Sequence, residues 1–250
     1  MPLSLVGSEM CIRDSHGEML GQQGARGKLV PWEESIRVPT LIYHPDLKKQ
    51  QKCESIISNI DLVPTILEFS GLDKDTINTN YPELKGTSFA NLVENVDHKN
   101  NRDNEGHLIH GVQIIPTVFN VAEKFRHIGL ADSLIDKFKA FATKGNFLPD
   151  FSPPLNYKGV VDKRYKFIRY FSPRENNIPN TFAELSNNNA SFQLYDLLND
   201  PYEMHDISKT ENNKGLLMSM NDKLNKLTDK EIGLENHILH LPGPDWFWTT

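Results

Sequence analysis

Residues 16–39 read HGEMLGQQGARGKLVPWEESIRVP, and this run is the most informative stretch of the chain. Its first half is rich in glycine, which lets a backbone turn closely around a small ligand. His16 offers an imidazole to a metal or an anion, and Lys28 offers a compact cation to an oxyanion. Taken alone, one His and one Lys in a glycine-rich loop are weak evidence, and an ordinary surface loop explains them better.

The residues after this loop predict the edge of an α/β sheet. Residues 37–43 predict a strand, and residues 54–58 predict a second strand or a strand-like connector. Asp61 is a good N-cap for a helix over residues 62–70, which Gly71 ends. The expected buried residues of the first strand are Val38, Leu41, Ile42 and Tyr43, and the expected shared face of the helix is Leu62, Ile66 and Phe69.

The middle of the chain is less regular. Residues 73–104 are polar and predict a loop with one short helix, whereas residues 107–115 are apolar and β-like. Residues 120–143 suggest one or two helices. Residues 145–156, with prolines nearby, predict a linker or the boundary of an insertion.

The last third predicts a small antiparallel sheet with one helix. Residues 160–171 alternate as two strands around a turn at Asp162-Lys163, and residues 192–197 form a third strand. Residues 199–203 (NDPYE) are a turn, because Asn and Asp bond their own backbone and Pro presets φ. Residues 214–227 predict a helix that packs on this sheet through Leu216, Leu217, Met220, Leu224 and Leu227. We expect Trp246, Phe247 and Trp248 to dock the tail onto the body.

Composition excludes some classes of protein. The chain has 250 residues, enough for one or two domains, and a net charge of −6 without a dense basic stripe, which disfavours nucleic-acid binding. No apolar run approaches the ~20 residues that a membrane span needs. Of the two cysteines, Cys11 lies in an unusual N-terminal segment, so Cys53 is the single native one and no intrachain disulfide is expected.

That N-terminal segment, residues 1–15 (MPLSLVGSEMCIRDS), does not fit a signal peptide, because its apolar stretch is too short and acids follow at once. LVGSEMCIRD resembles the conceptual translation of a sequencing-library adapter. We therefore expect residues 1–15 to be disordered and adapter-derived, with His16 the first authentic residue. A genuine disordered N-terminus is the alternative.

Five segments in chain order match motifs of one family: residues 16–39, 59–71, 85–88, 164–169 and 194–203. In the first, His16-Gly-Glu18, Lys28, Trp32-Glu-Glu34 and Arg37-Val-Pro39 all match. Together they resemble the sulfatases, the arylsulfatase-type branch of the alkaline phosphatase superfamily. The resemblance implies the C-terminal part of the α/β catalytic domain over residues 16–92, a partly helical insertion over 93–156, and a small α+β subdomain of antiparallel sheet plus helix over 157–250.

Carried over by position, the resemblance implies a calcium-dependent sulfuric ester hydrolase in which His16 ligates calcium beside an Asp and Lys28 binds a sulfate oxygen. Ser15 stands where the family has that Asp, and Gln23 where it has a His. The formylglycine nucleophile comes from Cys-x-Pro-Ser-Arg, a motif absent here, so no catalytic residue is assigned. We expect this chain to be a sulfatase fragment that is inactive alone.

The implied substrate is a small-molecule or glycan sulfate ester, with no nucleic-acid partner and no membrane span. The family implies a periplasmic or extracellular location, although this segment carries no signal peptide. Two alternatives stay open: a phosphoester or phosphonate hydrolase of the same superfamily, and a non-catalytic binding module. Oligomeric state cannot be read from the sequence.

The other titratable candidates have structural explanations. For His107 and His110, a surface or packing role is favoured over lining a cleft, and His205 after the turn is structural. His237 and His240 lack a third metal ligand nearby. Glu33 and Glu34 are adjacent, so on a strand their side chains would point to opposite faces. This favours a structural ion pair or a helix cap over a pair of carboxyl groups that act together in one site.

Overall fold

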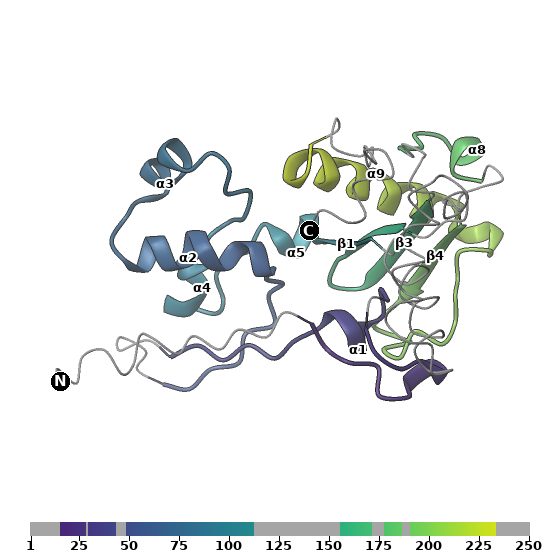
Figure 1. The fold of residues 1–250 in the computed structure, drawn as a ribbon, viewed down its shortest axis with the longest axis horizontal. Coiled ribbons are helices and arrows are strands. Elements are labelled where there is room, and N and C mark those ends of the chain that lie inside the picture. The colour runs from purple at the N-terminus through teal and green to yellow at the C-terminus, as the bar shows by residue number, and fades with distance from the viewer. Residues whose placement is uncertain are drawn as a thin grey trace, which may run out of the picture. The chain divides into compact units, whose positions relative to one another are not determined.

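The computed structural model describes residues 16–28, 30–43, 49–112, 156–171, 178–186 and 191–233. They belong to two compact units, Met1–Asn100 and Asn101–Thr250 (Figure 1). The predictions for residues 1–15, for the helices of 120–143 and for the linker up to residue 155 lie outside the described residues. So do those for His237, His240 and the aromatic tail.

The described part of the first unit is built of short helices joined by loops. They are η2 (Gln22–Gly24), α1 (Glu33–Ile36), η3 (Asn59–Asp61), α2 (Leu62–Phe69), α3 (Lys74–Asn80) and α4 (Ala90–Glu94). The predicted helix after Asp61 is confirmed, and Gly71 ends it with a left-handed φ of 99°. The polar stretch after it holds more helix than expected, since α3 and α4 both lie there.

Helix α2 packs with a different face from the expected one. Pro64 and Thr65 are its buried residues, whereas Ile66 is 60% exposed and Phe69 is 37% exposed. The small core beside α2 consists of Phe89, Leu92 and Val93, with Ile57 and Leu62 packed against it. The tertiary contacts of α4 therefore override the apolar periodicity of α2.

The strand predicted over residues 37–43 is wrong. This segment forms no hydrogen-bonded strand, and Leu41 and Tyr43 are 98% and 90% exposed. Residues 54–58 form a connector, the second of the two predicted alternatives. A β-strand is defined by hydrogen bonds to a neighbour, and no described residue pairs with either segment.

The second unit contains, in its described residues, an antiparallel sheet in the order β1-β2-β3-β4 (Figure 1). Its strands are β1 (His107–Val112), β2 (Asn156–Val161), β3 (Tyr165–Phe171) and β4 (Ser191–Asp196), and its helices are α5 (Arg102–Glu105), α8 (Phe182–Leu185), η4 (Glu211–Asn213) and α9 (Lys214–Glu231). The predicted hairpin, third strand, turn and long helix are confirmed. The mixed helix and antiparallel sheet is the fold class expected of a sulfatase C-terminal part.

Strand β1 comes from the predicted insertion of residues 93–156, yet it pairs with β2 along its whole length, from His107 opposite Val161 to Val112 opposite Asn156. The apolar, β-like segment is therefore an edge strand of the C-terminal sheet. The proposed domain limits themselves stay predictions.

Helix α9 covers one face of this sheet and forms the main core. Val160, Phe167 and Leu194 of the strands pack against Leu217, Met220, Leu224 and Leu227 of the helix, with Leu185 of α8 completing the cluster. Leu216 packs on the rim of this cluster. The predicted apolar spacing therefore identifies the packed face correctly.

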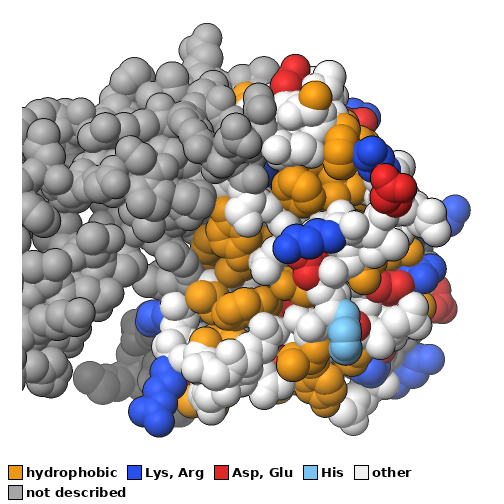
Figure 2. Space-filling model, turned by 90° about the vertical axis from the view of Figure 1, so that its right-hand side faces the viewer, with side chains coloured by type: hydrophobic (Ala, Val, Ile, Leu, Met, Phe, Trp, Pro, Cys, Tyr) orange, Lys and Arg blue, Asp and Glu red, His pale blue; other side chains and the backbone are white. Residues whose placement is uncertain are grey.

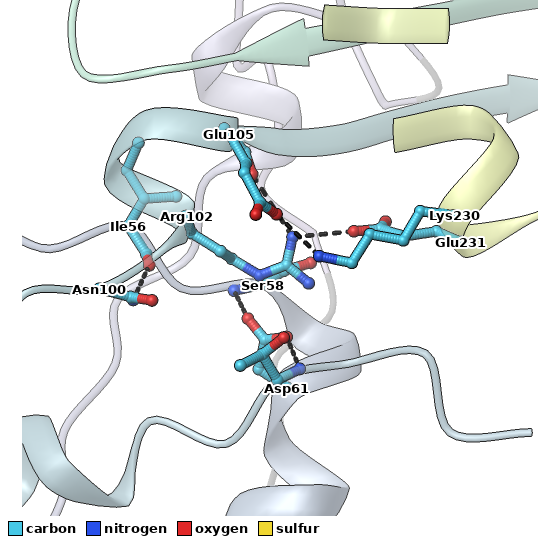
Figure 3. A network of polar contacts seen from close by, with 10 residues as sticks. Ile56, Ser58, Asp61, Asn100, Arg102, Glu105, Lys230 and Glu231 are labelled. Carbon is cyan, nitrogen blue, oxygen red and sulfur yellow. Dashed lines mark hydrogen bonds and ion pairs between the residues drawn. The ribbon is translucent and has the colours of Figure 1, made fainter. Parts of the chain in front are cut away.

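Ion pairs tie the other elements of the second unit together. Lys166 of β3 lies 2.7 Å from Glu203, and both side chains are fully buried. Arg102 of α5 lies 2.9 Å from Glu231 at the end of α9, with 4% and 5% of the two side chains exposed (Figure 3). These contacts join residues far apart in the sequence, so periodicity does not reveal them.

Candidate functional site

The glycine-rich segment of residues 16–28 folds back on itself as a closed loop. The amide of Met19 donates to the carbonyl of Gly27 at 2.8 Å, and the amide of Gly21 donates to that of Ala25 at 2.9 Å. The Met19 side chain is 1% exposed and anchors the loop. Gly21 and Gly27 have φ of 101° and 81°, a region that costs other residues energy.

This closure brings the two predicted site residues together. Lys28 Nζ lies 2.8 Å from His16 Nε2, and His16 Nδ1 lies 2.9 Å from the carbonyl oxygen of Gly17. An ammonium can only donate, so Nε2 is the acceptor and Nδ1–H donates to the carbonyl. This geometry requires a neutral imidazole. Both side chains are exposed, so an external ligand can reach them.

Close backbone packing fixes where this loop starts. The Gly17 amide donates to the carbonyl oxygen of Ser35 at 2.8 Å, and a Cβ on Gly17 would lie 2.0 Å from the carbonyl oxygen of Glu34. Glu33 and Glu34 form the first turn of α1 rather than part of a strand. The loop is thus attached to a helix whose first turn carries two acids.

The third family-like motif, residues 85–88, is held by a buried carboxylate. Asp61 is 1% exposed; its Oδ1 accepts the amide of Thr87 and its Oδ2 accepts the amide of Ser58, both at 2.8 Å (the Ser58 bond is drawn in Figure 3). Gly86 passes so near that a Cβ would lie 2.0 Å from the carbonyl oxygen of Ile60. Sequence reasoning took Asp61 for a helix cap, but its side chain does not cap α2.

The other histidine candidates in the described residues have no metal-like surroundings. His110 is exposed on β1, and His205 lies 3.5 Å from Asp200 in the turn after β4. In the parts of the chain that the structure describes, no three His, Cys, Asp or Glu side chains gather into a metal site. Figure 2 shows a face on which acidic, basic and hydrophobic side chains are interspersed. No helix of the described ranges is long and apolar enough to cross a membrane.

Residues 21–121, which include most of the glycine-rich loop and the Asp61 region, match the sequence family described as N-sulphoglucosamine sulphohydrolase, C-terminal. Over these residues the chain is similar to the C-terminal region of sulfatases. An ulvan-active sulfatase of Formosa agariphila is 34% identical over 93 residues, which are 35% of this chain and 17% of the relative.

Two further comparisons give a relative named as a sulfatase and a solved structure of similar fold. An extracellular sulfatase SULF-1 homologue of Drosophila melanogaster is 41% identical over 58 residues, or 23% of this chain and 5% of that protein. A protein solved in complex with its substrate D-glucosamine-2-N,6-O-disulfate has the same fold, with a TM-score of 0.55 and 18% identity over 86% of this chain and 33% of its own. The chain therefore spans a third or less of the length of these relatives.

Proposed function

We propose that this chain belongs to a sulfuric ester hydrolase in which His16 and Lys28 line the site for the sulfate group. The observation that carries the proposal is the 2.8 Å contact between Lys28 Nζ and His16 Nε2, in a closed loop whose residues 21–28 fall within the sulfatase family match. Residues that are well separated in sequence converge there, with exposed polar atoms. A loop without a ligand role does not need this convergence.

In the proposed reaction Lys28 is the group that contacts the sulfate. Its ammonium donates hydrogen bonds to a sulfate oxygen and offsets the charge that develops on the ester oxygen as the bond to sulfur breaks. His16 holds Lys28 in place through Nε2 before the ester arrives. When the ammonium turns to the sulfate, the lone pair of Nε2 becomes available to another group.

Calcium is the cofactor that the family resemblance implies. Calcium binds six to eight oxygen ligands, whereas the described residues offer one imidazole nitrogen that already accepts from a lysine, and no cluster of acids. The described residues by themselves do not fit a calcium ion. Calcium dependence with His16 as one ligand stays a proposal that requires carboxylates from other sequence.

The nucleophile of the proposed reaction is a formylglycine derived from a Cys-x-Pro-Ser-Arg motif, which this sequence lacks. Cys53 is exposed and is followed by Glu54-Ser55 rather than by that motif. We infer that the chain alone binds a sulfate ester but does not hydrolyse it. Release of product from an aryl sulfate above the blank by the purified chain overturns this inference.

The proposed substrate is a small-molecule or glycan sulfate ester, met outside the cytoplasm. Support comes from the structural neighbour solved with a disulfated glucosamine and from the relative named as an extracellular sulfatase. Nucleic acid is not a proposed partner, because the net charge is −6.

The test is the affinity of the purified chain for p-nitrophenyl sulfate, measured by titration calorimetry. We expect Lys28→Met to weaken binding about three- to tenfold, the range for a charge-assisted hydrogen bond at an exposed site. Lys52→Met is the matched control, because Lys52 is also exposed, with 86% of its side chain accessible. Equal affinities of wild type and Lys28→Met refute the assignment, and tighter binding of p-nitrophenyl phosphate than of the sulfate would favour a phosphoester hydrolase.

A further inference from the structure

A second cationic side chain lies beside Lys28 in the glycine-rich loop. Arg26 precedes Lys28 by two residues, and both side chains are exposed. Because a chain spans at most about 3.6 Å per residue, the Cα atoms of Arg26 and Lys28 lie within about 7 Å of each other. Gly27, between them, is fixed by its carbonyl oxygen, which accepts the amide of Met19 at 2.8 Å. The closure of the loop therefore holds the two cations next to each other.

The two cations differ in what holds their charged groups. Lys28 Nζ lies 2.8 Å from His16 Nε2, so the ammonium has a neighbour within the loop. In the part of the chain that the structure describes, the guanidinium of Arg26 has neither an ion-pair nor a hydrogen-bond partner. Its five N–H donors are thus open to a ligand that comes from solvent, and such a ligand needs no cavity to reach them.

The loop is basic in an otherwise acidic chain. Residues 16–28 hold two cations, Arg26 and Lys28, and one acid, Glu18, so with His16 neutral the loop has a net charge of +1, against −6 for the whole chain. Among the described residues, Glu18 forms no ion pair with either cation. A ligand with two anionic groups can contact both cations, whereas a ligand with a single sulfate leaves Arg26 in water.

We propose that Arg26 selects sulfate esters that carry a second oxyanion, a carboxylate or a further sulfate, near the sulfate that Lys28 contacts. This inference rests on the proposed function, in which Lys28 binds the sulfate group of the ester. A guanidinium is suited to the second group because it is planar and donates two parallel hydrogen bonds to a carboxylate or sulfate. Arg26 contacts a part of the ligand that does not react, so it determines which ester binds.

The experiment compares two esters of nearly equal shape by titration calorimetry with the full chain. p-Nitrophenyl sulfate carries one anionic group, and 4-carboxyphenyl sulfate carries a carboxylate in place of the nitro group. We expect the wild type to bind the carboxylate ester about three- to tenfold more tightly, the range for a charge-assisted hydrogen bond at an exposed site. Hydroquinone disulfate, in a second arm, replaces the carboxylate by a sulfate, and the tighter of the two ligands identifies the preferred oxyanion.

Three variants test the role of Arg26. Arg26→Met should abolish the preference for the second anion and change the affinity for p-nitrophenyl sulfate by less than about twofold, the effect of a distant exposed charge. Arg26→Lys keeps the charge but not the paired donors, so it should retain only part of the preference. Lys52→Met removes an equal charge at an exposed position outside the loop and should retain all of it.

The outcomes separate this inference from the proposed function. If the wild type binds neither doubly anionic ester more tightly than p-nitrophenyl sulfate, or if Arg26→Met keeps the preference, the role of Arg26 is refuted. Lys28→Met should weaken the binding of all three esters alike. Wild-type affinity of Lys28→Met for p-nitrophenyl sulfate refutes the proposed function instead, and no binding of any ester by the wild type refutes both.

Discussion

The fully buried Lys166–Glu203 pair allows a quantitative test of how the second unit is held together. At 2.7 Å and an effective dielectric constant of about 20, the attraction between unit charges is ~6 kcal/mol. Desolvation of the two ions offsets most of this, but removing one partner leaves the other buried without its ion-pair partner, which costs about 3–5 kcal/mol. We therefore expect Glu203→Gln, which keeps the side-chain shape, to destabilise the protein by about 3–5 kcal/mol.

The double variant distinguishes this explanation from simple loss of packing. Lys166→Met combined with Glu203→Gln removes both charges, so its cost should lie well below the sum of the two single variants, because no unpaired charge remains. Thermal unfolding followed by near-ultraviolet circular dichroism measures all three; for a chain of this size each kcal/mol corresponds to about 2–4 °C. Additive effects of the two substitutions, or a single variant that melts with the wild type, would refute the reasoning.

Three further predictions concern Asp61, Gly17 and Lys158. Asp61→Ala leaves the amides of Ser58 and Thr87 without their acceptor and should lower the free energy of unfolding by about 2–4 kcal/mol. Faster limited proteolysis of the first unit would report this loss. Asp61→Asn keeps one acceptor oxygen and should have a smaller effect. Gly17→Ala places a Cβ 2.0 Å from a backbone oxygen of α1 and should open the glycine-rich loop, seen as lost amide protection at Met19 in hydrogen exchange. Lys158 has a pKa of about 8 in the folded chain against an ordinary value of 10.5, because burial disfavours its charged form. Between these two pH values the unfolded chain binds more protons than the folded chain, so the free energy of unfolding should rise from pH 8 to 10.5. A Lys158→Met variant that shows the same rise in urea titrations would contradict the lowered pKa of Lys158.

Local chemistry in the sequence identifies much of the second unit. The turn at Asp162, the strand pair around it and the helix of residues 214–231 depend on rules that act within a few residues, such as a side chain that accepts a nearby amide. The same holds for the stop of α2 at Gly71, where only a residue that tolerates a positive φ fits. Residues 37–43 show the limit, since their apolar pattern predicts a strand and no described neighbour pairs with them.

For the candidate site, the sequence motifs resemble one family and point to His16 and Lys28, whose roles stay predictions. The 2.8 Å contact between Lys28 and His16 arises from the backbone hydrogen bonds that close the loop. Asp61 holds the motif of residues 85–88 because it accepts the amide of Thr87, which lies far from Asp61 in the sequence. The burial of Lys166 with Glu203 and the opposition of Lys158 to Arg169 depend on strand register and on turns that return the chain to the sheet. Periodicity describes the few residues on either side of a position, whereas partners and desolvation are set by whatever the folded chain places across from it.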